Sequence, residues 1–339
     1  MARSRMARRR SRAGFSLTEL MISLLLGAVV LVALLRAIGT ATAALRSRDA
    51  VAEARERARF ALASLEPDIQ MAGFYGLSAH GADFGWLSAG DIASAASAGA
   101  LRQSAPPLAA APPATHECGD NFALDLAIAI QASDDAYGFG APMRAGCQPN
   151  GSARPGSDTL TIRRASSGTS APAAGRVQLL VDRSDERRRW LFADGVLPPG
   201  LALATGLLQC HDLELRSYYI ANDSVGQRGS PALRVKSLTS VAGVPAYLDT
   251  EVMPGIEDLQ VRLQTDSGIY DPQQLPAGAQ VRAVQIWLRV RAITPEPGFT
   301  DRHTYRYADV ETTPGSAEAH YRRLLVTRII AVRNAGGRA

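Results

Sequence analysis

The feature that most constrains the fold of this chain is an uncharged apolar stretch near its start, residues 20–35, with the sequence LMISLLLGAVVLVALL. Extended back to Phe15, it is 21 residues long and is interrupted only by Glu19. A helix needs about 20 apolar residues to cross a bilayer. Basic residues beside such a helix hold that end in the cytoplasm, and six precede it here: Arg3, Arg5, Arg8, Arg9, Arg10 and Arg12. We therefore expect residues 15–36 to cross the membrane once and to send the rest of the chain outward.

The net charge does not support a nucleic-acid-binding surface. The 339 residues carry a net charge of +5, but the first 14 contribute six arginines and no acid, which leaves −1 for the remainder. Binding to phosphates needs basic residues that cluster on the folded part of a protein. The chain is 46% hydrophobic, so it can bury a substantial core. No nucleic-acid partner is expected.

The helical pattern continues beyond the apolar stretch, over residues 37–72. Good helix formers dominate this region. Apolar residues recur every three or four positions, which predicts one buried stripe: Val51, Ala54, Ala58, Leu62, Leu65 and Ile69. Pro67 lacks a backbone donor, so we expect it to kink or end the helix, and Gly73 can close the helix after it.

The rest of the chain changes from a loop-like pattern to a strand pattern. Residues 73–157 are rich in Gly, Ala, Ser and Pro, which favours loops. From residue 158, apolar and polar residues alternate as in half-buried strands. The clearest example is VRAVQIWLRVRAI, in which one face carries Val284, Ile286, Leu288 and Val290. We therefore predict an α+β fold, in which residues 158–339 form an antiparallel sheet whose apolar face is covered by the helix stripe.

No catalytic or metal-binding constellation is recognisable in the sequence. The cysteines, Cys118, Cys147 and Cys210, are too few and too scattered for a zinc or iron–sulfur site. In an oxidising compartment the nearest two, Cys118 and Cys147, are the favoured disulfide, although the sequence alone does not fix the pairing. Cys210 is then expected to be a buried thiol. We expect no enzymatic activity, no cofactor and no metal.

A conventional secretory signal is the simplest alternative for the N-terminal segment. Ala41, Thr42 and Ala43 offer an A-x-A cleavage site, and cleavage there would release a soluble secreted domain. The long apolar run, the acid inside it and the helical pattern that continues through the proposed cut all argue against this alternative.

The junction Gly14-Phe15-Ser16-Leu17-Thr18-Glu19 resembles the processing site of type IV pilins and pseudopilins. The resemblance implies that residues 1–14 are a basic leader, which a prepilin peptidase removes by cutting between Gly14 and Phe15. It also implies that Phe15 is then methylated and that Glu19 is kept in the mature chain. The pilin fold that goes with it has a long N-terminal helix whose second half lies on an antiparallel sheet.

The acid in the apolar run has a physical explanation if this cut is made. An unpaired acid inside a bilayer costs about 2.5–3.5 kcal/mol on insertion scales, and cleavage creates a counter-charge, the α-amine of Phe15. Our hypothesis is that Glu19 of one subunit pairs with the Phe15 amine of a neighbour as a filament assembles. The alternative is that Glu19 extends toward the nearby membrane surface and pairs with nothing.

More narrowly, the chain is similar to the PilW family of minor pilins, through stretches such as RARFALASLEPDIQMAGFYG, VMPGIEDLQVRLQTD and RRLLVTRIIAVRN. It departs from that family at Leu263 and Gln264, where Tyr-Gly is usual. The resemblance implies a role in initiation or assembly of type IV pili, with other minor pilins, the major pilin and the inner-membrane assembly platform as partners. It also implies an inner-membrane location with a periplasmic domain before assembly and a place in the pilus afterwards.

Two other functions stay open from the sequence. The chain could be a minor pseudopilin of a type II secretion system, or a subunit at the pilus tip that binds surfaces or DNA. The outer face of the strand with Trp287, Arg289 and Arg291 is the predicted contact surface for partners.

Overall fold

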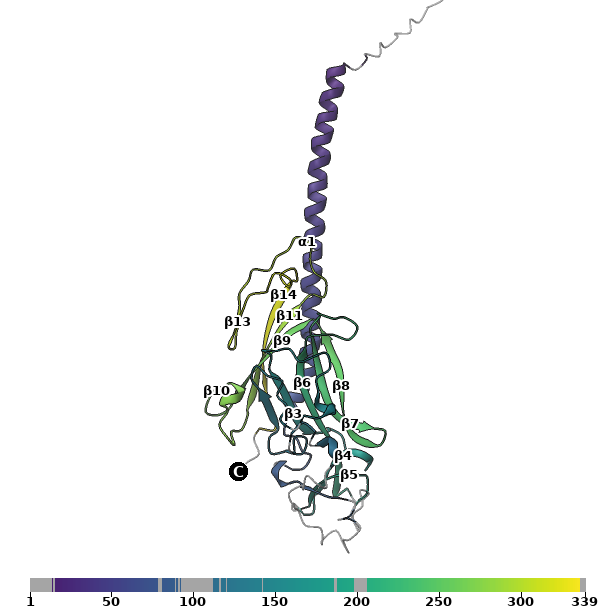
Figure 1. Cartoon of the computed structure of the whole chain (residues 1–339), viewed down its shortest axis with the longest axis vertical. Coiled ribbons are helices and arrows are strands. Elements are labelled where there is room, and N and C mark those ends of the chain that lie inside the picture. The colour runs from purple at the N-terminus through teal and green to yellow at the C-terminus, as the bar shows by residue number, and fades with distance from the viewer. Residues whose placement is uncertain are drawn as a thin grey trace, which may run out of the picture. The chain divides into compact units, whose positions relative to one another are not determined.

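The structure is a computed structural model (Figure 1), and it describes residues 14, 16–78, 81–88, 90, 92, 112–115, 117–119, 121–141, 143–185, 188–197 and 206–335. The chain divides into two compact units, Met1–Asp49 and Ala50–Ala339. Phe15 and the arginines of the leader lie outside the described residues.

A single helix, α1, runs from Leu17 to Met71 and belongs to both units. Pro67 lies inside it, and the helix ends four residues later at Met71, just before Gly73. Because Pro67 has no backbone N–H, the carbonyl of Ala63 lacks its usual donor four residues later. Both residues are exposed, so water can satisfy that carbonyl. Gly73 follows the helix with a positive φ of 73°, and its N–H donates to the carbonyl of Arg163 at 3.1 Å.

The part of α1 within the second unit buries one stripe of mostly small side chains. Ala54, Ala58, Ala61, Leu65 and Ile69 are each at most 3% exposed. Leu62 is partly buried against the same core. Alanine at three of these positions lets the backbone of the helix approach the strands closely, so the main hydrophobic core forms directly on this stripe.

The β structure comprises two main sheets and one small hairpin. The first sheet contains β1 (Gly85–Trp86), β2 (Ile130–Ser133), β3 (Thr159–Ala165), β4 (Ala174–Asp182), β5 (Arg189–Asp194), β6 (Leu208–Ala221), β7 (Ala232–Val241) and β8 (Val244–Pro254). The second has the order β10 (Ile269–Tyr270), β9 (Ile256–Gln264), β11 (Ala283–Arg291) and β14 (Arg323–Ala331). The hairpin pairs β12 (Tyr305–Tyr307) with β13 (Val310–Thr312). Short 3-10 helices occur at Gly81–Asp83, Pro113–Thr115, Ala145–Cys147 and Pro272–Gln274.

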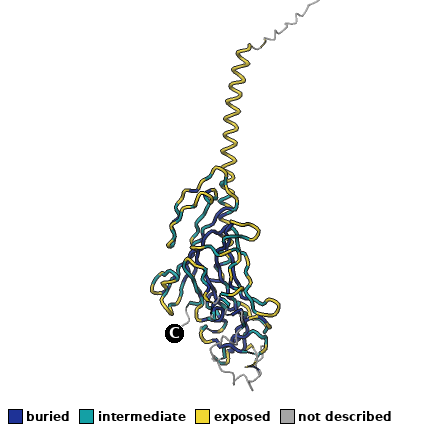
Figure 2. Tube along the Cα trace, viewed as in Figure 1, coloured by how far each residue is buried: buried dark blue, intermediate teal, exposed yellow. Residues whose placement is uncertain are grey.

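Both main sheets contribute to the core that α1 covers. Figure 2 shows the buried trace concentrated in these strands. The long strand β6 contributes Tyr218 and Ile220, and β11 contributes Val284, Ile286, Leu288 and Val290. The other face of the first sheet builds a second core, in which Leu213 and Leu215 pack with Tyr75, Phe84 and Trp86.

The predicted α+β class, with a long helix on antiparallel strands, is confirmed, and the structure adds detail that the alternation did not give. The strands form two main sheets, and one pair, β1 with β5, is parallel. The region expected to be loops holds β1 and β2. The strands β5 and β8 lack the alternation of half-buried strands: β5 is only six residues long, and in β8 every residue is half-buried or exposed.

Replacing Leu65 with alanine should lower the free energy of unfolding by about 2–5 kcal/mol, because it leaves a cavity in a fully buried part of the core. The measurement is denaturant unfolding of the full chain in detergent, followed by circular dichroism. The matched control is Phe60→Ala on the same helix, where the side chain is 54% exposed and the change should cost far less. Equal losses from the two variants would contradict the described helix orientation.

Candidate functional site

The predicted cleavage junction is only partly described, because Gly14 has a position and Phe15 does not. Among the described residues, no atom lies within 4 Å of a Cβ atom placed on Gly14, and no positive φ is found there. Nothing in the described part of the chain therefore requires glycine at this position.

The helix begins with a capping box built from Ser16 and Glu19. The N–H of Ser16 donates to a carboxylate oxygen of Glu19 at 3.0 Å. In return, the N–H of Thr18 donates to the Ser16 hydroxyl at 3.2 Å. This arrangement satisfies backbone donors that the first turn of a helix leaves free. Glu19 thus has a local function in the single chain, and among the described residues it has no cationic partner.

The helix after this cap presents apolar side chains on all sides. Every residue from Leu17 to Leu45 is exposed, including large side chains such as Leu24, Val30 and Leu35. The helix is long and apolar enough to cross a membrane. An exposed apolar helix of this kind needs lipid or other helices around it.

In the second unit, a buried carboxylate ties α1 to the first sheet. Asp68 is 1% exposed and lies within the apolar stripe of the helix. It accepts hydrogen bonds from Arg164 at 2.9 and 3.1 Å, from Arg216 at 3.0 and 3.1 Å, and from the Tyr218 hydroxyl at 2.6 Å. Burial and the nearby Asp68 charge raise the pKa of Tyr218, so this hydroxyl remains a donor. The role of Asp68 was not predicted from the sequence. Its position was a usable signal, because a residue three positions after Leu65 lies on the buried stripe of the helix.

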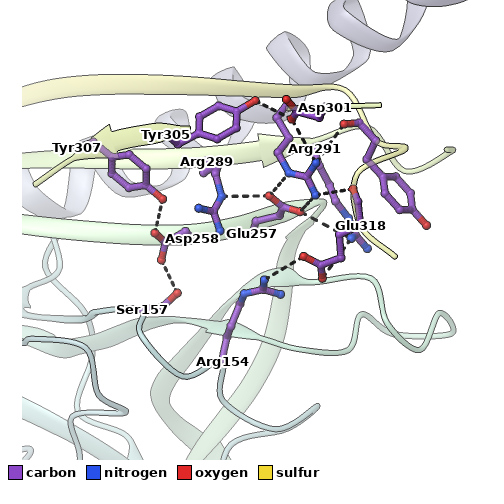
Figure 3. Close-up of polar contacts among 12 residues, drawn as sticks. Arg154, Ser157, Glu257, Asp258, Arg289, Arg291, Asp301, Tyr305, Tyr307 and Glu318 are labelled. Atoms are coloured by element: carbon purple, nitrogen blue, oxygen red, sulfur yellow. Dashed lines mark hydrogen bonds and ion pairs between the residues drawn. The ribbon is translucent and has the colours of Figure 1, made fainter. Parts of the chain in front are cut away.

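A second buried carboxylate, Glu257, organises the outer face of the second sheet (Figure 3). It is 1% exposed, and Arg323 binds both of its oxygens at 2.7 and 2.8 Å. Arg289 donates to it at 3.1 Å, and a guanidinium nitrogen of Arg291 lies 3.7 Å away. Burial tends to raise the pKa of Glu257, but the hydrogen bonds and charge of Arg323, with the charges of Arg289 and Arg291, hold that pKa below its usual value.

A register shift in β9 makes this cluster possible. Arg289 of β11 pairs with Asp258, and the next residue, Val290, pairs with Ile256, so Glu257 is the extra residue of a bulge. Gly255 precedes it with a φ of 83°, and a Cβ atom there would lie 2.8 Å from the carbonyl oxygen of Arg291. Glycine is therefore needed where this bulge begins.

The cluster holds down a segment that crosses the outer face of the sheet. This cover segment, residues 292–322, connects β11 to β14 and includes the β12–β13 hairpin. Its Asp301 accepts hydrogen bonds from Tyr305 at 2.9 Å and from Arg323 at 3.3 Å. The hydroxyl of Tyr307, in the cover segment, donates to Asp258 of β9 at 2.6 Å. Figure 3 shows this contact between the two residues.

The predicted contact surface needs a correction because of this cover. Trp287, Arg289 and Arg291 do lie on the outer face of β11, since they alternate with its buried residues. Arg291 is only 2% exposed, and Arg289 is engaged with Glu257, so neither is free to meet a partner. Trp287 is half-buried. The alternation identified the face but could not reveal what covers it.

The structure joins Cys118 to Cys147, with their Cα atoms 5.3 Å apart. Both cysteines are fully buried in the second core. The Tyr137 hydroxyl donates to the carbonyl of Cys147 at 2.6 Å. Cys210 is a buried free thiol, and burial raises its pKa to about 11, which leaves it unreactive at neutral pH. Among the described residues, no group of three or more His, Cys, Asp or Glu side chains could hold a metal ion.

Two family profiles match the chain. The family described as Type IV Pilus-assembly protein W matches residues 217–334, and the prokaryotic N-terminal methylation motif matches residues 9–35. The first match includes the Glu257 cluster, and the second includes Gly14, Phe15 and Glu19. A solved type IV-like pilin from Thermus thermophilus is similar at 14% identity, over 53% of this chain and 79% of that chain, with a TM-score of 0.26. No curated protein matches.

The Glu257 cluster predicts that the second unit loses stability in acid. Because the folded pKa of Glu257 is lowered, its contribution is present above the unfolded value of about 4.3 and is lost as the pH falls below it. Unfolding of the full chain in detergent, measured at a series of pH values, should show this loss. Glu257→Gln should cost about 3–5 kcal/mol at neutral pH, because it leaves buried arginines unpaired, and its stability should fall less steeply in acid.

The matched control for this prediction is Glu311→Gln on the cover hairpin. Glu311 is 62% exposed and its only ion pair among the described residues is with the exposed Arg306. Such pairs contribute little, so this variant should keep the stability of the unmodified chain. A Glu257→Gln variant as stable as this control would show that the cluster does not hold the cover segment.

Proposed function

Since this chain belongs to the PilW family of type IV pilus minor pilins, we propose that it is a prepilin that takes part in the initiation and assembly of type IV pili. A prepilin peptidase removes residues 1–14 between Gly14 and Phe15 and methylates Phe15. The mature subunit stays in the inner membrane through its apolar helix until it joins the filament. It is a substrate of the processing machinery and a structural component of the pilus, with no catalysis of its own.

The observation that carries this proposal is the coincidence of two matches on one chain. The methylation motif covers residues 9–35, and the PilW match covers residues 217–334. No described atom crowds Gly14. A glycine that is not required by the described fold is in keeping with a peptidase that requires glycine before its cut. The apolar helix supplies the membrane anchor that a prepilin requires.

The proposed location follows from the charges and cysteines. The arginine-rich leader favours the cytoplasmic side, which puts the second unit in the periplasm before assembly. A disulfide between Cys118 and Cys147 is in keeping with an oxidising compartment of this kind. The partners in assembly are other minor pilins, the major pilin and the inner-membrane assembly platform.

Glu19 is the residue that we assign to assembly. In the single chain its carboxylate accepts only from its own Ser16 N–H among backbone donors, and the free α-amine of a processed neighbour offers a full positive charge. In a bilayer an unpaired acid is costly, so pairing with that amine favours packing of helices in one register.

Gly14→Glu should give a chain of unprocessed mass that stays in the inner membrane, because a charged side chain at the cut crowds the active site of the peptidase. Intact-mass analysis of the membrane fraction measures this directly. The control is Ser11→Glu, which adds the same charge to the leader and leaves the cut residue unchanged; it should be processed and methylated at Phe15. Normal cleavage of Gly14→Glu would contradict the proposed processing site.

Glu19→Gln separates the charge of Glu19 from its function as a helix cap. Glutamine can replace glutamate in a capping box, but it cannot form an ion pair. We expect this variant to be processed normally and to be depleted from sheared pili, as is expected of Glu19→Val. The matched variant Ser16→Ala weakens the box but keeps the charge, so it should still enter pili. Incorporation of Glu19→Gln at the level of the unmodified chain would refute the pairing.

A further inference from the structure

The strand β14 forms an open edge of the second sheet. It is the last strand in the order β10-β9-β11-β14, and it pairs with β11 over nine consecutive residues without a register shift. Figure 1 shows β14 beside β11. Within the described ranges, no main-chain hydrogen bond reaches β14 from its other side. An unpaired regular strand presents a row of free N–H and C=O groups.

The other long edge in the described structure is protected in ways that β14 is not. The edge strand β8 contains Pro245 near its start and Pro254 at its end, and its pairing with β7 has a register shift. Prolines and bulges are the usual means of blocking an edge. The other strands at the ends of a sheet are at most four residues long: β1, β2, β10, β12 and β13. In β14, RLLVTRIIA, there is no proline, glycine or acid.

The exposed side chains of β14 define what a partner strand would meet. Ile329 is 60% exposed and lies opposite Gln285 on the outer face, next to the Thr327–Trp287 pair. Arg328 is also exposed and lies opposite the buried Ile286, on the core face. No ion pair to Arg328 is found in the described parts of the chain.

Arg328 argues against a second copy of this chain as the partner. A two-fold antiparallel pairing centred on Arg328 would place two Arg328 side chains directly opposite each other, and like charges in that position are destabilising. An acid at that place in a different strand would gain a cross-strand ion pair. The same residue therefore disfavours self-pairing and selects an acidic partner.

We infer that β14 accepts an extended strand from a different protein, which adds to the sheet beside Thr327–Ala331. The partner strand carries an acidic residue next to Arg328 and apolar residues on the face of Ile329. Main-chain hydrogen bonds supply affinity in this mode, and alternate side chains supply specificity. This inference rests on the sheet edge and does not depend on the pilus proposal.

The test uses the full chain in detergent and two fluorescently labelled peptides, Thr-Val-Thr-Val-Glu-Val-Thr-Val-Thr and the same sequence with Lys in place of Glu. Binding is measured by anisotropy, and amide hydrogen exchange locates the bound strand. The unmodified chain should bind the Glu peptide up to about tenfold more tightly than the Lys peptide. The amides of β14 should exchange more slowly in the complex.

Charge reversal makes the result specific to the edge. Arg328→Glu should invert the preference, so that the Lys peptide binds more tightly. The matched control is Arg302→Glu, another exposed arginine that lies in the cover segment, and it should keep the preference for the Glu peptide. The inference is overturned if neither peptide binds, if both bind equally, if the preference survives Arg328→Glu, or if the protected amides lie in another strand.

Discussion

The packing of the second unit depends on a carboxylate buried within the apolar stripe of its helix. Asp68 receives donors from Arg164 and Arg216 of neighbouring strands and from Tyr218. Small alanines bring the helix close to the sheets but allow it to slide, because apolar contacts are not directional. The fixed geometry of the hydrogen bonds to Asp68 permits one position, and loss of one partner of such a buried pair costs about 3–5 kcal/mol.

The second sheet uses the same principle on its opposite face. A bulge in β9 at Glu257 lets the adjacent acids Glu257 and Asp258 both meet partners beneath the cover segment. Three arginines bind Glu257, and Tyr307 binds Asp258. One face of the sheet is thus closed by apolar packing on α1 and the other largely by ion pairs. Among the described residues of this sheet, the edge at β14 and the part of the outer face around Ile329 are left uncovered.

The sequence predicted features that follow from regular spacing and missed features that arise from distant contacts. The helix stripe and the inward residues of β11 repeat with fixed periods, so Leu65 and Val284 could be placed before the structure was known. Asp68 and Glu257 could not, because Arg164 lies 96 residues from Asp68 and Arg323 lies 66 residues from Glu257 along the chain. The burial of Arg291 was missed for a related reason: the segment that covers it has no period of its own.

The capping box at the start of α1 changes how the proposed pairing of Glu19 should be understood. The carboxylate already accepts a hydrogen bond from Ser16 in the isolated chain, so a neighbour's amine would replace an existing contact. The net free energy of pairing is then a difference between two hydrogen-bonded states, smaller than it would be for an acid with no partner. If the proposed pairing forms, an exchange of this kind lets the helix leave its neighbours without exposing a bare charge.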